Sequence, residues 1–104
     1  MIERKLLGSV LINPESFKTL NKDLRSSMFN DRRNRFIFNV IKYLVKKEQP
    51  FDVVNLINIL INIGDIDKAG GEQYILELTN EIETSEEAEL LSDLIVEGNL
   101  DKGE

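Results

Sequence analysis

The segment at residues 52–64, DVVNLINILINIG, decides the fold class. Its many β-branched residues are typical of a strand, but the run is too long for an ordinary strand. Asp52 is a favourable N-cap, and Gly64 is a favourable residue at which to end a helix. Steps of three and four residues place the polar side chains between them on one helix face: Asn55, Asn58 and Asn62. The segment therefore predicts a helix that is apolar around most of its circumference.

Helical periodicity and turn residues continue on both sides of this segment. Apolar residues over most of 31–47 predict a central place for that helix. The predicted fold is all-α, a single globular bundle of five to six short helices over 1–98, followed by a flexible tail at 99–104. The other helices are expected at 2–12, from Pro14, at 31–47 with Asn30 as N-cap, at 72–82, and from the capping box Thr84–Glu87 to a C-cap at Gly98.

The composition excludes several classes of active site. The 104 residues contain no cysteine and no histidine, which rules out disulfide frameworks, Cys/His zinc sites, Cys nucleophiles and Ser-His-Asp triads. No phosphate-binding loop of the form G-x-x-x-x-G-K-[ST] occurs, and the glycines at 64, 70 and 71 are expected to serve positive φ angles in a turn. We therefore expect no enzyme activity, no catalytic residue, no cofactor and no metal.

The sequence also predicts a location and an origin. No apolar run approaches the roughly 18–20 residues that span a bilayer, and the N-terminus does not resemble a signal peptide. We expect a cytoplasmic protein that makes no membrane contact. The chain has 12 Ile, 10 Asn and 8 Lys but only 2 Ala, a bias towards AT-rich codons. This bias predicts a low-GC bacterium, or a phage or mobile element of one, as the source.

The charge is divided between the two halves of the chain. Residues 1–50 hold eleven Lys and Arg against five Asp and Glu, whereas residues 51–104 hold two against fourteen. At helical spacing, four cations of the first half fall in one stripe: Arg32, Arg35, Lys42 and Lys46. Clustered cations can contact phosphate, but no aromatic residues interleave this stripe. We expect a solvated or acidic-partner-facing surface, and a small DNA-binding regulator that uses helix 31–47 remains an open alternative.

Several motifs occur in the order of one known family. They are ERKLLGSVLINPESF at 3–17, MF at 28–29 with RFIF at 35–38, EQPFDVV at 48–54 in place of Gly-x-Pro-Ile-Asp, GDI at 64–66 with GGEQY at 70–74, and the helix and Ser/Thr turn at 78–85. In this order and spacing, residues 3–97 resemble the N-terminal domain of DnaB-type replicative DNA helicases. Two departures stand out. The chain has Arg33-Asn34 where the family usually shows a histidine, and it lacks the long helical hairpin that follows in the family.

The resemblance implies a non-catalytic protein–protein interaction module of DNA replication. In the family this domain shapes the hexamer collar and engages primase and loader proteins, so the expected partners are a primase, a helicase loader, a helicase or a polymerase. The native-looking Met1 and the polar end favour a stand-alone phage or mobile-element copy that acts as an adaptor or decoy. A weak homodimer or a partner complex is expected through one apolar side of the last helix: Leu90, Leu91, Leu94 and Ile95. The apolar helix at 52–64 is a second candidate, either as core or as an exposed patch.

Overall fold

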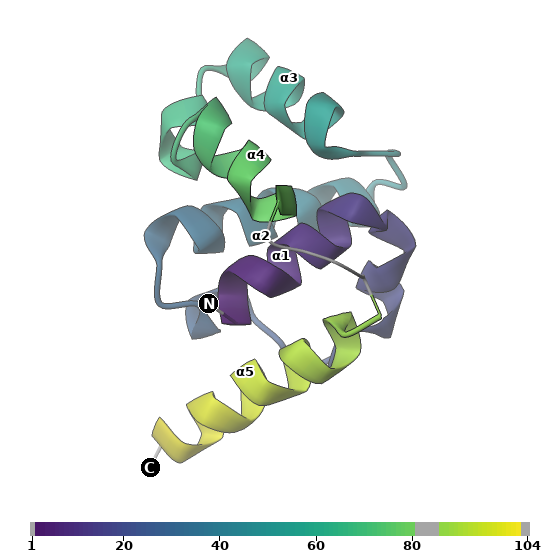
Figure 1. The fold of residues 1–104 in the computed structure, drawn as a ribbon, viewed down its shortest axis with the longest axis vertical. Coiled ribbons are helices and arrows are strands. Elements are labelled where there is room, and N and C mark those ends of the chain that lie inside the picture. Colours follow the sequence, from purple (N-terminus) through teal and green to yellow (C-terminus); the bar gives the residue numbers. More distant parts are fainter. Residues whose placement is uncertain (1, 81–85, 103–104) are drawn as a thin grey trace.

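The computed structural model describes residues 2–80 and 86–102, with side chains as far as residue 99 (Figure 1). All regular structure in these ranges is helical, which confirms the all-α prediction. None of these helices is long and apolar enough to cross a membrane. The elements in chain order are α1 (Ile2–Ile12), η1 (Pro14–Thr19), η2 (Ser26–Met28), α2 (Arg32–Lys46), α3 (Val53–Ile63), η3 (Ile66–Ala69), α4 (Glu72–Asn80) and α5 (Ala88–Lys102), where η marks a 3-10 helix.

Helix α1 is the most enclosed element of the bundle. Figure 1 shows it crossing the middle of the molecule, and it packs against α2, α4, α5 and η1. Its core residues are between 0% and 2% exposed, and Gly8 and Ser9 are also buried. The expected central place of helix 31–47 is therefore wrong in part, since Tyr43 on α2 is 59% exposed. The α1 core residues are Leu6, Leu7, Val10 and Leu11.

Helix α3 has both predicted caps. The Asp52 carboxylate accepts a hydrogen bond from the Asn55 amide at 2.7 Å, and Gly64 ends the helix in the left-handed region at φ 81°. The helix lies at one edge of the molecule and packs mainly on α4 and η3 among the described elements (Figure 1). As a result, Val54 is 60% and Ile61 48% exposed. Both alternatives for this helix are therefore realised in part: Leu56 and Leu60 belong to the core, and the opposite side is an exposed apolar patch.

Two helix ends differ from the prediction. The N-cap of α2 is Asp31 and not Asn30, because the Asp31 carboxylate accepts the hydrogen bond from the Arg33 amide at 2.8 Å. Helix α5 does not end at Gly98 and continues to Lys102, so the first part of the expected tail at 99–104 is helical. The Asn99 side chain donates to the carbonyls of Ile95 and Met28, which ties this turn to η2. Thr84 and Ser85 of the predicted capping box, and the end of helix 72–82, lie outside the described residues.

Candidate protein-interaction site

The four residues predicted for association divide into two rows on α5. Leu91 and Ile95 face inward, and each is 7% exposed. Leu90 and Leu94 face outward, at 58% and 41% exposure. Residues four apart share a helix row, and neighbouring positions lie about 100° apart, so the two pairs cannot serve one surface. The prediction is therefore wrong for Leu91 and Ile95 as surface residues, and Leu90 and Leu94 remain as candidates.

Carboxylates lie on one flank of the two exposed leucines in the α5 region. Glu86 precedes α5 and Glu89 lies in its first turn, and Asp93 and Glu97 follow along the helix at helical spacing. Asp93 also accepts a hydrogen bond from the Asn21 side chain at 2.8 Å, which holds α5 against the loop after η1. The outer side of α5 thus combines apolar area with negative charge. Such a face fits a partner that offers an apolar contact and positive charge around it.

A hollow adjoins Leu94 where α5 passes the starts of α1 and α2. Its volume is about 460 Å³, and its walls include the half-exposed side chains of Ile2 and Met28 as well as Leu94. Glu3 and Asn99 add polar groups to the same walls. The apolar surface of α5 therefore continues into a concave region, as protein-binding surfaces commonly do around an anchor residue.

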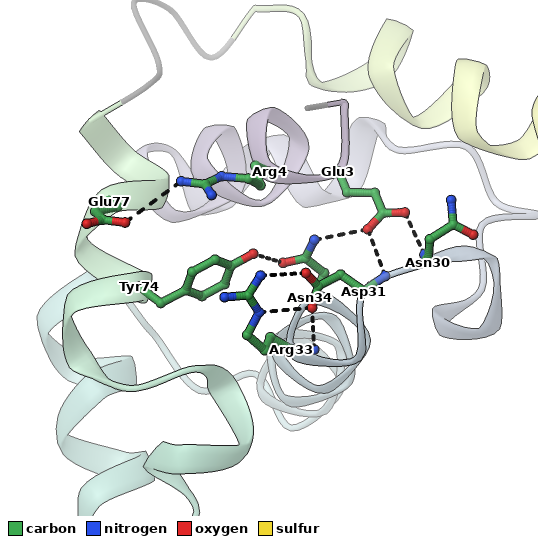
Figure 2. Close-up of polar contacts among 8 residues, drawn as sticks. All are labelled: Glu3, Arg4, Asn30, Asp31, Arg33, Asn34, Tyr74 and Glu77. Carbon is green, nitrogen blue, oxygen red and sulfur yellow. Dashed lines mark hydrogen bonds and ion pairs between the residues drawn. The ribbon is translucent and has the colours of Figure 1, made fainter.

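A network of polar contacts builds one wall of this hollow (Figure 2). The Glu3 carboxylate accepts hydrogen bonds from the Asn30 amide at 2.6 Å, the Asp31 amide at 3.4 Å and the Asn34 side-chain nitrogen at 2.9 Å. The Tyr74 hydroxyl donates to the Asn34 side-chain oxygen at 2.5 Å. Asn34 is only 2% exposed. It links α1, α2 and α4, and it stands at the position where the sequence departs from the resembled family.

Two arginines flank the ring of Tyr74. The Arg33 guanidinium lies 3.9 Å and that of Arg4 5.2 Å from the ring centroid. Arg33 also donates to the Asp31 carboxylate, and this bond lowers the pKa of Asp31 to about 2 and raises that of Arg33. Burial raises the pKa of the Tyr74 hydroxyl. A Cβ at Gly70 would meet Arg33 at 2.7 Å and Tyr74 at 2.9 Å, so only glycine lets this chain segment pass.

The predicted cation stripe lies along α2. All four of its members are exposed, but the Arg35 Nε donates to the Phe29 carbonyl at 2.7 Å and so serves the fold as well. Lys42 lines a separate hollow, described below, whose lining does not include Arg32, Arg35 or Lys46. Among the described residues, no group of three or more acidic side chains is placed to hold a metal ion.

The described residues form an all-α domain with exposed apolar and charged surfaces. The family model described as "DnaB-like helicase N terminal domain" matches residues 1–97, and the chain belongs to this family. The sequence resemblance is thereby confirmed. The chain is 33% identical over 82 residues to a "Probable replicative DNA helicase" of Trieres chinensis, which covers 79% of this chain and 18% of the relative. It is 28% identical over 96 residues to "Replicative DNA helicase DnaB" of Rhodothermus marinus, covering 92% of this chain and 10% of the relative.

The fold also matches a solved structure. The crystal structure of the N-terminal domain of DnaB helicase from Mycobacterium tuberculosis superposes with a TM-score of 0.83 at 22% sequence identity. The match covers 92% of this chain and 67% of that one. The chain thus spans less than a fifth of the two helicase relatives. It resembles the N-terminal domain, which is a non-catalytic part of a replicative helicase.

Proposed function

We propose that this chain is a non-catalytic protein-interaction module of DNA replication that associates through the outer side of α5. One observation carries the proposal: Leu90 and Leu94 are exposed side by side on α5, with carboxylates on one flank. The proposed role in replication is supported by relatives that are named as replicative helicases. The proposed partners are a second copy of the chain and a replication protein such as a primase, a helicase loader, a helicase or a polymerase.

The affinity of such a contact is set by two opposing terms. Complete burial of a leucine side chain contributes at most about 1.5–3 kcal/mol. Leu90 and Leu94 are already 42% and 59% covered within the chain, as their exposed fractions of 58% and 41% show, so each gains less than that. Association also costs at least several kcal/mol of translational and rotational freedom. The surplus is therefore small, and we expect weak self-association, with tighter binding only where a partner adds contacts in the hollow beside Leu94.

A pair of matched variants tests the partner role. Leu90→Asp/Leu94→Asp places two charges on α5, and Val54→Asp/Ile61→Asp makes the same change on the exposed side of α3. Binding to the purified primase and helicase loader of the source organism is measured by biolayer interferometry. We expect the α5 variant to lose binding and the α3 variant to keep it. Equal binding of wild type and the α5 variant, with both folded by circular dichroism, contradicts the proposal.

A further inference from the structure

A second hollow lies away from the outer side of α5, between η1, the loop after it and α2. Its volume is about 370 Å³, and Phe17, Leu24, Phe38 and Val45 form its apolar floor. Phe17 and Phe38 stack with ring centroids 5.9 Å apart. A hollow of this size accepts one or two large side chains of a partner.

Three lysines form the rim of this hollow: Lys18, Lys22 and Lys42. No carboxylate belongs to its lining. Within the described residues, Lys22 and Lys42 have no ion-pair partner, while Lys18 pairs with Glu15 at 3.1 Å. Both members of that pair are more than 70% exposed, so the pair holds Lys18 only weakly. The rim therefore carries positive charge that the chain itself does not neutralise.

The loop that carries Lys22 is fixed by α5. The Asn21 amide donates to the Ser92 hydroxyl at 2.8 Å, and Ser92 is fully buried. The Asn21 side chain bonds Asp93, and its oxygen accepts from the Asp23 amide at 2.8 Å. Lys22 thus stands between two tethered neighbours. A rim that is already in place lowers the ordering cost of binding.

We propose that this lysine-rimmed hollow binds an acidic peptide segment of a partner protein, with a large apolar side chain seated on the floor and carboxylates against the lysines. The apolar floor and the uncompensated cations together define that chemistry. Nucleic acid fits less well, because Phe38 is 3% exposed and packs on Phe17 and Phe29, which leaves the Phe38 ring closed to base stacking. The inference goes beyond the proposed function, since it concerns a surface other than the outer side of α5.

The test uses two charge-reversal variants of the full chain. Lys22→Glu/Lys42→Glu reverses the rim, and Arg32→Glu/Lys46→Glu makes an equal charge change on exposed α2 residues outside the hollow. The probe is a short fluorescein-labelled peptide with one phenylalanine and one leucine set among glutamates, followed by fluorescence anisotropy at two salt concentrations. Comparison probes are the same peptide with both apolar residues changed to alanine, and a single-stranded oligodeoxynucleotide. Circular dichroism melting confirms that both variants are folded.

We expect the acidic peptide to bind wild type, to weaken with salt, and to lose at least about tenfold in affinity with the rim variant. The outside variant should change the affinity by less than about threefold. Absence of peptide binding, equal loss in both variants, or equal binding of the alanine peptide would overturn the proposal. Tighter binding of the oligonucleotide that depends on Lys22 and Lys42 would assign the hollow to nucleic acid instead. A rim variant that loses self-association while the peptide fails to bind would assign it to a second copy.

Discussion

Replacement of Tyr74 by phenylalanine isolates one hydrogen bond of the polar network. The substitution removes the hydroxyl that donates to the Asn34 oxygen at 2.5 Å and leaves the ring, with Arg33 over it, in place. Asn34 is 2% exposed, so water cannot readily replace the lost donor. A buried acceptor left without a donor costs about 1–3 kcal/mol. We expect the free energy of unfolding to fall by about 2 kcal/mol, or about 8–16 °C in the melting temperature of a domain of this size.

Urea denaturation followed by circular dichroism measures this loss. The matched control is Tyr43→Phe, because Tyr43 is 59% exposed and should change stability by less than about 0.5 kcal/mol. A double-mutant cycle with Asn34→Ala then gives the coupling between the two side chains, for which we expect about 1–2 kcal/mol. If Tyr74→Phe is as stable as Tyr43→Phe, the Asn34 bond contributes nothing measurable and the network does not hold α2 to α4.

Three further predictions concern caps, strain and nucleic acid. Asp31→Ala should lower the free energy of unfolding by about 1 kcal/mol at pH 7, because the helix loses its N-cap. The pKa of Asp31 is lowered in the folded chain from 3.8 to about 2, so its carboxylate stabilises the fold fully above pH 3.8. In thermal melts the difference between the variant and wild type should therefore shrink as the pH falls from 4 to 2. Glu48 has φ 57°, a left-handed conformation that strains a residue with a Cβ, so Glu48→Gly should raise the free energy of unfolding by about 0.5–1 kcal/mol. A lower free energy of unfolding in urea titration would show that Glu48 is not strained. Duplex DNA should bind the chain weakly at physiological salt in an anisotropy titration, and Arg32→Glu/Lys46→Glu should leave that affinity unchanged. Tight binding with a steep salt slope would favour the DNA-binding alternative.

The parts of the fold that the sequence predicted depend on local interactions. The ends of α3 follow from Asp52 and Gly64, each of which acts within its own helix. The cap of α2 was missed by one residue because Asn30 and Asp31 are both favourable N-cap residues, and the sequence alone does not show which side chain accepts from the first turn. The end of α5 was missed for a different reason, since Asn99 bonds the carbonyl of Met28 in η2.

The candidate surfaces were predictable only in part. Periodicity placed Leu90 and Leu94 on a helix, but their exposure depends on where α1 and η1 pack against α5. The stripe on α2 included Lys42, yet its neighbour Lys22 comes from a loop with no helical spacing to reveal it. Asn34 belongs to the pair Arg33-Asn34 that stands where the resembled family usually shows a histidine. Its hydrogen bond to Tyr74, forty residues away, could not be predicted from the local sequence pattern.

Sedimentation velocity over a range of protein concentrations tests the central claim most directly. The account predicts that the sedimentation coefficients of wild type and of the Val54→Asp/Ile61→Asp variant rise with protein concentration, because their α5 surfaces are intact and associate weakly. The Leu90→Asp/Leu94→Asp variant should remain folded and sediment as a monomer at every concentration. A wild type that stays monomeric throughout, or an α5 variant that associates as wild type does, would contradict the claim that this chain associates through the outer side of α5.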